Sequence, residues 1–182
     1  MTVDTCKITT VTVTSFSTNC YIVRSEGSKT CVIIDPGGDG NKILRKVKEL
    51  GLSVNYVFCT HGHPDHTGGV EDLCRETGAE FFIGKGDENL IEKPPQYIVD
   101  LLPSFKNPPK NYKTFSDDVQ ICLEGLDITV IRTPGHTPGS ISYLINGSIF
   151  SGDTLFRESV GRTDLPGGDF TLEISNIKSR VL

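Results

Sequence analysis

The sequence predicts an α/β protein, and three observations support that prediction. Short β-branched runs typical of strands alternate with segments of helical spacing through the first half of the chain. Polar loops follow several of the strands, and one such loop holds three of the four histidines. The length of 182 residues suits one domain with a hydrophobic core, so we expect a single domain over residues 1–182.

The first third of the chain has the pattern of strands. We expect strands over Cys6–Val13, Asn19–Ser25 and Thr30–Asp35, where β-branched and alternating residues dominate. The dipeptide Glu26-Gly27 suits a hairpin turn between the second and third strands.

The next part alternates helices with strands. Apolar residues at 43, 44, 47 and 50 predict a helix over Asn41–Leu50, and Gly51 is a typical residue to end it. We then expect a strand over Val54–Thr60, a helix over Val70–Thr77 and a strand over Glu80–Gly84.

The segment Lys93–Asn111 holds five of the ten prolines, so we expect a long loop with a short helical piece at Tyr97–Leu101. This loop is either a lid over a site or a plain connection between two halves of the domain. Strands resume after it, and a glycine-rich loop over 161–168 precedes a last helix that starts near Asp169 or Phe170. The expected strands are Val119–Leu123, Leu126–Arg132, Ile141–Ile145 and Ser148–Phe150.

The amino-acid composition excludes some classes of binding partner. The net charge of −5, from 18 basic and 23 acidic residues, argues against nucleic acid. No apolar run approaches the roughly 18 residues of a membrane span. Residues 1–4 lack the basic start of a secretory signal, and no apolar stretch follows them. We therefore expect a cytoplasmic protein with neither a nucleic-acid nor a membrane partner; its oligomeric state stays open.

Six cysteines are present, and no CxxC pair occurs. Because a chain of this length without a secretory signal needs no disulfides, we expect buried, reduced thiols. Cys74 lies in a helical pattern; the others lie in or beside strand-like runs, at Cys6, Cys20, Cys31, Cys59 and Cys122.

The segment from Thr60 to His66 carries the strongest functional pattern. It follows a predicted strand and contains His61, His63, Asp65 and His66. Imidazole nitrogens and a carboxylate are what a divalent transition metal binds, and zinc is the commonest such ion. His61 and His63 can reach one ion, whereas Asp65 and His66 point elsewhere and can reach a second.

Two later residues extend this set. His136 lies in a rigid loop of prolines and glycines after a strand, which suits a metal ligand better than a lone structural histidine. Asp153 ends a strand among apolar residues, where an unpaired carboxylate is costly unless bound cations neutralise it. Asp153 can therefore bridge two ions.

With these residues in place, the sequence resembles the metallo-β-lactamase superfamily, and within it the glyoxalase II-like branch. The resemblance covers nearly the whole chain. It rests on the HxHxDH pattern of 61–66 and on four further motifs, Asp35-Pro36-Gly37-Gly38, the loop 133–139, Ser151-Gly152-Asp153-Thr154-Leu155-Phe156 and the loop 161–168.

The resemblance implies a four-layer αββα sandwich with the metal site at the edge between two sheets. It implies one ion on His61, His63 and His136, a second on Asp65 and His66, and Asp153 as the bridge. The family supplies a further histidine on a later strand, but no histidine follows His136 here. The resemblance therefore implies a chain that lacks the last strand and the closing helix of the fold.

The implied activity is hydrolysis of an acyl-glutathione-type thioester, a small molecule, by a metal-bound hydroxide. Zinc is the expected metal, as one or two ions, with iron or manganese as alternatives. Asp65 is the expected catalytic residue, since it can orient the hydroxide and accept its proton. Asp35, Arg162 and Asp164 either support the ligands or merely form turns and a surface ion pair.

Two rival functions stay open. A persulfide dioxygenase also resembles this sequence and would hold a single Fe(II) on His61, His136 and Asp153. A non-catalytic metal-binding scaffold of the same fold would bind metal without turnover. β-Lactam hydrolysis and nuclease activity are disfavoured by the missing secretory signal and by the acidic charge.

Overall fold

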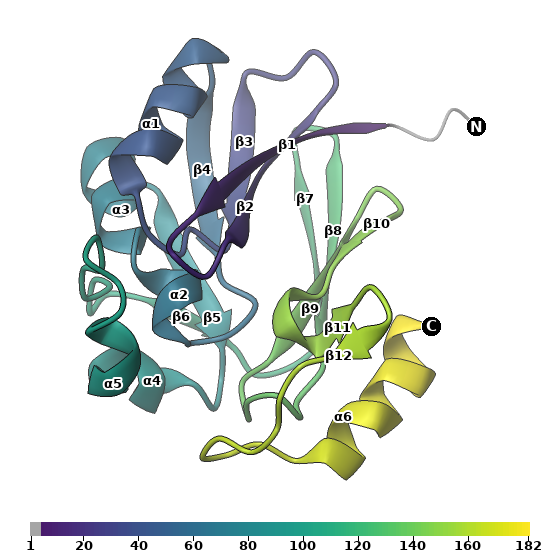
Figure 1. Cartoon of the computed structure of the whole chain (residues 1–182). Helices are drawn as coiled ribbons and strands as arrows, with labels where there is room; N and C mark the ends of the chain where they lie inside the picture. The colour runs from purple at the N-terminus through teal and green to yellow at the C-terminus, as the bar shows by residue number, and fades with distance from the viewer. Residues whose placement is uncertain (1–4) are drawn as a thin grey trace.

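The computed structural model describes residues 5–182 and arranges them in layers (Figure 1). The larger sheet has six strands. Its first three strands pair antiparallel, and the remaining three continue in parallel from β3. In sheet order the strands are β1 (Cys6–Val13), β2 (Thr18–Ser25), β3 (Thr30–Ile34), β4 (Ser53–Phe58), β5 (Glu80–Gly84) and β6 (Lys113–Phe115).

Helices α1 (Gly40–Glu49) and α3 (Val70–Thr77) cover one face of this sheet (Figure 1). Their apolar stripes are buried in one core cluster with the β-branched residues of the sheet, as Ile43 and Leu73 show. Gly40 allows the close approach of α1 to α3, because a Cβ there would lie 2.6 Å from the Cβ of Asp72.

The second sheet packs on the other face of the first. It has four antiparallel strands in the order β10 (Ser148–Phe150), β9 (Ile141–Ile145), β8 (Leu126–Arg132), β7 (Val119–Leu123). Phe58 of the first sheet stacks on Tyr143 of the second with ring centroids 5.1 Å apart, inside a second core cluster.

The rest of the chain lies at the end of the second sheet. It comprises the short 3₁₀ helix η1 (Gly152–Thr154), the hairpin β11 (Leu155–Phe156) and β12 (Ser159–Val160), helix α6 (Phe170–Asn176) and the π-helical turn η2 (Ile177–Val181). Helix α6 lies beyond the second sheet, at the lower right of Figure 1. The αββα order is confirmed, and no strand follows α6 within residues 5–182.

Several short elements were not predicted. They are α2 (Pro64–Thr67), α4 (Glu88–Glu92), β6 and the β11–β12 hairpin. The two helices have four and five residues, fewer than two turns, and the strands have two or three, so none shows a hydrophobic period and tertiary contacts decide their conformation. The expected helical piece in the proline-rich segment is α5 (Gln96–Val99).

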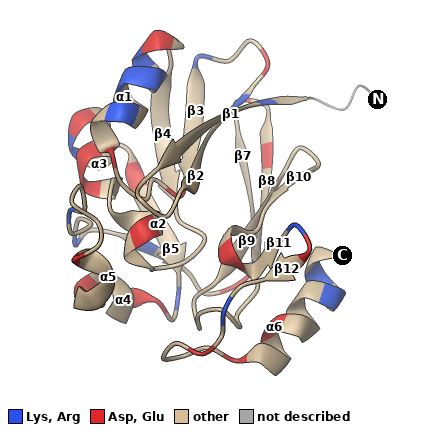
Figure 2. Cartoon of the chain, viewed as in Figure 1, with Lys and Arg blue, Asp and Glu red and all other residues tan. Residues whose placement is uncertain are grey.

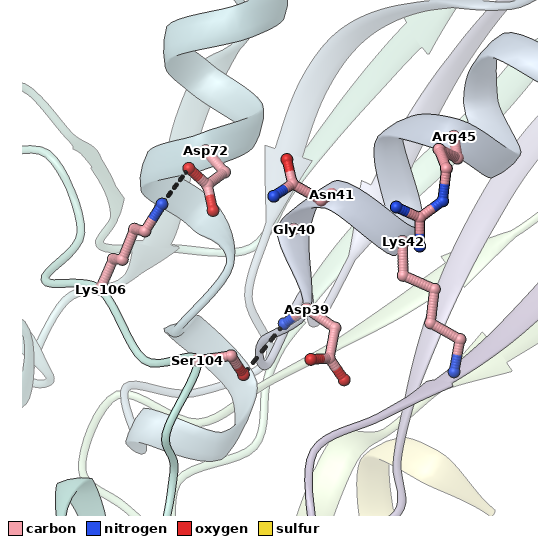
Figure 3. Close-up of a pocket in the computed structure, with 8 residues that line it drawn as sticks. All are labelled: Asp39, Gly40, Asn41, Lys42, Arg45, Asp72, Ser104 and Lys106. Carbon is pink, nitrogen blue, oxygen red and sulfur yellow. Dashed lines mark hydrogen bonds and ion pairs between the residues drawn. The ribbon is translucent and has the colours of Figure 1, made fainter.

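The proline-rich segment is tied to the first helical layer. Lys106 pairs with Asp72 at 2.7 Å, and the Asp39 N–H donates to Ser104 Oγ at 3.2 Å (Figure 3). These residues line a hollow of about 480 Å³ beside the start of α1. These contacts tie the segment to α1 and α3 and support the interpretation of it as a connection.

The cysteines are free, as predicted, but they are not all buried. Cys20, Cys31 and Cys59 are buried, whereas Cys122 is exposed, so the prediction is wrong for Cys122. Exposure alternates along β7, an edge strand, which places Cys122 on the uncovered face. Among the described helices, none has both the length and the apolar character to cross a membrane.

Tyr143 links the second sheet to the segment after β4, so its hydroxyl provides a test of this fold. The hydroxyl is buried and donates to the Cys59 carbonyl oxygen at 2.9 Å. We expect Tyr143→Phe to lower the free energy of unfolding by about 1–2 kcal/mol, because a buried carbonyl loses its donor. Urea denaturation measures this. The control is Tyr97→Phe, at an exposed position; equal effects of the two substitutions would contradict the prediction.

Candidate metal centre

The histidine loop begins where β4 ends, at the edge between the two sheets. The Thr60 carbonyl oxygen accepts from the Ile141 N–H at 2.7 Å, which ties the loop to the second sheet. His63 is extended and precedes α2, whose first residue is Pro64. Asp65 therefore lies in the first turn of α2, as His66 does.

Three histidines converge on one point. His136 Nε2 lies 3.2 Å from His61 Nε2 and 3.0 Å from His63 Nδ1. His136 comes from the loop after β8, so 75 residues separate it from His61. His136 Nδ1 contacts the Arg162 carbonyl oxygen at 2.7 Å. That oxygen only accepts, so Nδ1 carries the proton and Nε2 offers its lone pair.

A second group shares His61 with the first. The ligand atoms of His61, His66 and Asp153 all lie within 4.8 Å of one another. His66 Nε2 lies 3.2 Å from Asp153 Oδ1 and 3.6 Å from Asp65 Oδ2. Asp153 Oδ2 lies 3.8 Å from His136 Nε2. Asp153 therefore lies between the two groups, and all six predicted ligands gather at one site.

The burial of these side chains divides the histidines into two electrostatic types. Burial, and then the neighbouring histidines, lowers the pKa of His61 well below its ordinary range and that of His63 to about 3. Burial would also lower the pKa of His66, but Asp153 and Asp35 together hold it well above the ordinary value. Burial opposes ionisation of Asp153 too, yet its pKa is lowered because His66 lies beside it.

This donor set fits a divalent metal. His61 and His63 are neutral at physiological pH and offer lone pairs, and the carboxylates supply negative charge. Two acceptor nitrogens at 3.2 Å, as His61 Nε2 and His136 Nε2 are, repel each other unless a proton or a cation lies between them.

Asp35 supports the ligands, as one of its two sequence interpretations proposed. Its carboxylate accepts from the Thr60 N–H at 2.7 Å and from Thr60 Oγ1 at 2.8 Å. Its Oδ2 also lies 3.1 Å from His66 Nδ1. Asp35 therefore holds the start of the histidine loop by two hydrogen bonds and pairs electrostatically with the His66 ring.

Arg162 and Asp164 do not reach the site with their side chains. They form an ion pair at 2.8 Å, and both side chains are exposed to solvent, at 62% and 70%. This matches the surface-pair interpretation. The contribution of this loop to the site is the Arg162 backbone carbonyl, which receives the His136 ring.

Asp87 is a supporting residue that the sequence analysis did not find. It is fully buried, and its carboxylate accepts from the Gly62 N–H at 2.8 Å, the Gly139 N–H at 2.8 Å and Thr137 Oγ1 at 2.7 Å. Gly139 permits this, since a Cβ there would lie 2.6 Å from Asp87 Cγ. Asp87 directly precedes α4, so from sequence alone it is indistinguishable from a helix cap.

Glu173 of α6 is a second buried acid that the sequence analysis missed. Neither carboxylate oxygen has a hydrogen-bond partner among the described residues. Helix α6 packs against the His136 loop, where a Cβ on Gly135 would lie 2.3 Å from the Cβ of Glu173. Burial, and then the Asp153 charge, raises the pKa of Glu173 to about 7. An ordinary amphipathic helix pattern gives no indication of such a buried acid.

Asp87→Asn tests the link between the two ligand loops. We expect the free energy of unfolding to fall by about 2–4 kcal/mol and metal affinity to fall about 10- to 100-fold, because at least one of the three donors loses its acceptor. Urea denaturation and competition with a metal-binding dye measure the two effects. Asp117→Asn, at an exposed position, is the matched control. Unchanged metal affinity in Asp87→Asn would contradict a linking role.

Glu173→Gln tests the buried acid. Glu173 has a pKa of about 7 in the folded chain and an ordinary value of 4.5, so between these values only the folded state retains the proton. Its contribution to stability is therefore present at low pH and is lost as pH rises towards 7, with a slope of up to about 1.4 kcal/mol per pH unit. We expect Glu173→Gln to remove this slope in urea titrations with chelator. The exposed Glu158→Gln should retain it.

Known proteins are similar to this chain in sequence and in fold. The family model described as the metallo-beta-lactamase superfamily matches residues 13–182. Hydroxyacylglutathione hydrolase GloC of Haemophilus influenzae is 33% identical over 184 residues, which cover 94% of this chain and 82% of that protein. The probable metallo-hydrolase YqgX of Bacillus subtilis is 29% identical, over 90% of this chain and 78% of that protein.

Solved structures of other proteins are also similar to this chain. TTHA1623 in a di-iron-bound form has a TM-score of 0.82 and 30% identity, covering 93% of this chain and 84% of that one. ETHE1 from Myxococcus xanthus has a TM-score of 0.76 and 26% identity, over 96% of this chain and 69% of that one. With the family model spanning residues 13–182 and the histidine cluster at the edge between its sheets, this chain belongs to the metallo-β-lactamase superfamily.

Proposed function

We propose that this protein is a metal-dependent hydrolase of acyl-glutathione-type thioesters. The observation that supports this most is the convergence of His61, His63, His136 and Asp153 beside an open cleft that Asp65 and His66 also line. The similarity to hydroxyacylglutathione hydrolase GloC supports the choice of substrate class.

The roles that we propose for these residues follow from their positions in the candidate metal centre. His61, His63 and His136 hold one metal ion; Asp65 and His66 bind a second, and Asp153 lies between them. A divalent metal, when bound, supplies Lewis-acid activation of a water and of the thioester carbonyl. Asp65 lines the cleft and is the residue that orients the attacking water and takes up its proton.

The positions of the histidines favour a thioester over an amide as the substrate. The sequence has four histidines, and all four lie within the metal cluster. No histidine is therefore left outside the metal cluster to protonate a leaving group. A thiolate leaves without strong assistance from an acid because its conjugate thiol has a pKa of about 8.5, whereas an amine leaving group needs a proton.

Zinc is the proposed metal, with iron or manganese as alternatives. Imidazole nitrogens with carboxylate oxygens suit all three ions. The similar protein TTHA1623 was crystallised in a di-iron-bound form, which keeps iron under consideration for this chain.

One observation favours a second function. His61, His136 and Asp153 lie close together, with His136 Nε2 3.2 Å from His61 Nε2 and 3.8 Å from Asp153 Oδ2. Two histidines and one carboxylate are the ligand set of mononuclear Fe(II) oxygenases. An Fe(II) persulfide dioxygenase is therefore the alternative activity.

His61→Ala tests the proposal, because His61 belongs to both ligand groups. We expect wild-type protein to contain about one to two divalent ions and to hydrolyse S-lactoylglutathione, and His61→Ala to lose most of both. Elemental analysis and release of free thiol measure these. Gln120→Ala, at an exposed position on β7, is the control. Unchanged metal content and hydrolysis in His61→Ala would contradict the proposal.

The same preparation separates the alternatives. Iron content together with oxygen uptake on glutathione persulfide would establish the dioxygenase. Metal binding with neither activity would identify a non-catalytic scaffold.

A further inference from the structure

A cleft of about 720 Å³ opens beside the second ligand group. Asp35, Asp65, His66 and Asp153 line its inner part. One side comes from the turn between β1 and β2 and the start of β2, over 16–21, and the other from the segment 149–157 after β9. The cleft therefore lies between the two sheets and ends at the candidate metal centre.

Both sides of the cleft expose large apolar side chains. Phe16 is 49% exposed on one side, and Phe156 is 44% and Ile149 41% exposed on the other. Tyr21 packs edge-on against Phe150 deeper in the cleft, with centroids 5.0 Å apart. Exposed aromatic groups on two facing walls suit a ligand with an apolar section.

Arg157 is the one lysine or arginine among the residues that line this cleft. It occupies the two-residue turn of the β11–β12 hairpin, beside Glu158 in the left-handed conformation at φ 66°. In the described chain Arg157 has no hydrogen bond or ion pair, whereas the nearby Arg162 is paired with Asp164. A short hairpin thus presents an exposed and unpaired guanidinium at the cleft.

The charges on the lining of the cleft favour one orientation of a bound ligand. Three carboxylates, Asp35, Asp65 and Asp153, line the inner part, and the ring nitrogens of His66 lie 3.1, 3.6 and 3.2 Å from them. His66 also lies in that part, and the one further charged side chain of the lining is Arg157, in the turn of the β11–β12 hairpin, where Figure 2 shows charged residues. A guanidinium binds a carboxylate in a planar, two-point arrangement. An anionic group of a ligand is therefore attracted to Arg157, away from the acidic inner part.

We propose that Arg157 determines specificity by binding a carboxylate on the thiol half of the substrate, while the apolar walls hold its less polar section. This inference rests on the proposed thioester hydrolase function. It names Arg157 as the residue by which the site distinguishes thioesters of carboxylate-bearing thiols from thioesters of neutral thiols.

Binding without turnover tests the inference. The probes are S-hexylglutathione, a thioether that cannot be hydrolysed, and its diethyl ester, which lacks both carboxylates. By calorimetry on the metal-loaded protein, we expect wild type to bind the acid about tenfold more tightly than the diester. Arg157→Gln should lose that preference, and Arg157→Lys should keep part of it. Arg45→Gln removes the same charge from α1, outside this cleft, and should keep the full preference.

Kinetics provide a second readout. With S-lactoylglutathione as the substrate, we expect Arg157→Gln to raise KM about tenfold and to leave kcat little changed, because the lost contact is distant from the reacting carbonyl. With the diethyl ester of S-lactoylglutathione, we expect Arg157→Gln to change neither KM nor kcat. The inference is overturned if wild type shows no preference for the acid, or if Arg157→Gln affects acid and diester equally. Carboxylate-dependent binding without thioester hydrolysis would overturn the proposed function alone.

Discussion

A single buried carboxylate joins the two loops on which the candidate metal centre depends. Asp87 accepts from the Gly62 N–H in the histidine loop and from Thr137 and Gly139 in the loop that carries His136. Burial raises its pKa, and three donors offset that cost. These hydrogen bonds, together with the one from the Ile141 N–H to the Thr60 carbonyl oxygen, hold the loops of His61 and His136 in place relative to each other.

The centre is preorganised by opposite electrostatic effects. His61 and His63 are kept neutral by burial, which leaves their nitrogens free to bind a cation. Asp35 and Asp153 keep the pKa of His66 high, so at neutral pH it carries a proton until a cation displaces it. A cation must therefore displace a proton from His66 to bind at the second group.

Helices and strands were predictable from the sequence where their pattern of apolar residues was long enough to show a period. Helix α1 and the strands β1–β4 and β7–β9 have five or more residues each, and their hydrophobic periods mark them in the sequence. The short elements α2, α4 and β6 have no such period and were missed. The exposure of Cys122 was missed for a related reason: one strand's sequence does not tell which of its faces remains uncovered.

The sequence by itself determined the chemistry of the site. Three histidines and an aspartate within six residues after a strand indicate a set of metal donors, because residues this near in sequence are also near in space. Only the tertiary structure decided the rest: that Asp87 joins the loops of His61 and His136, that Glu173 is buried with no hydrogen-bond partner among the described residues, and that Arg157 faces the cleft. Each of these depends on contacts between distant segments, which packing of the two sheets creates and no local pattern encodes.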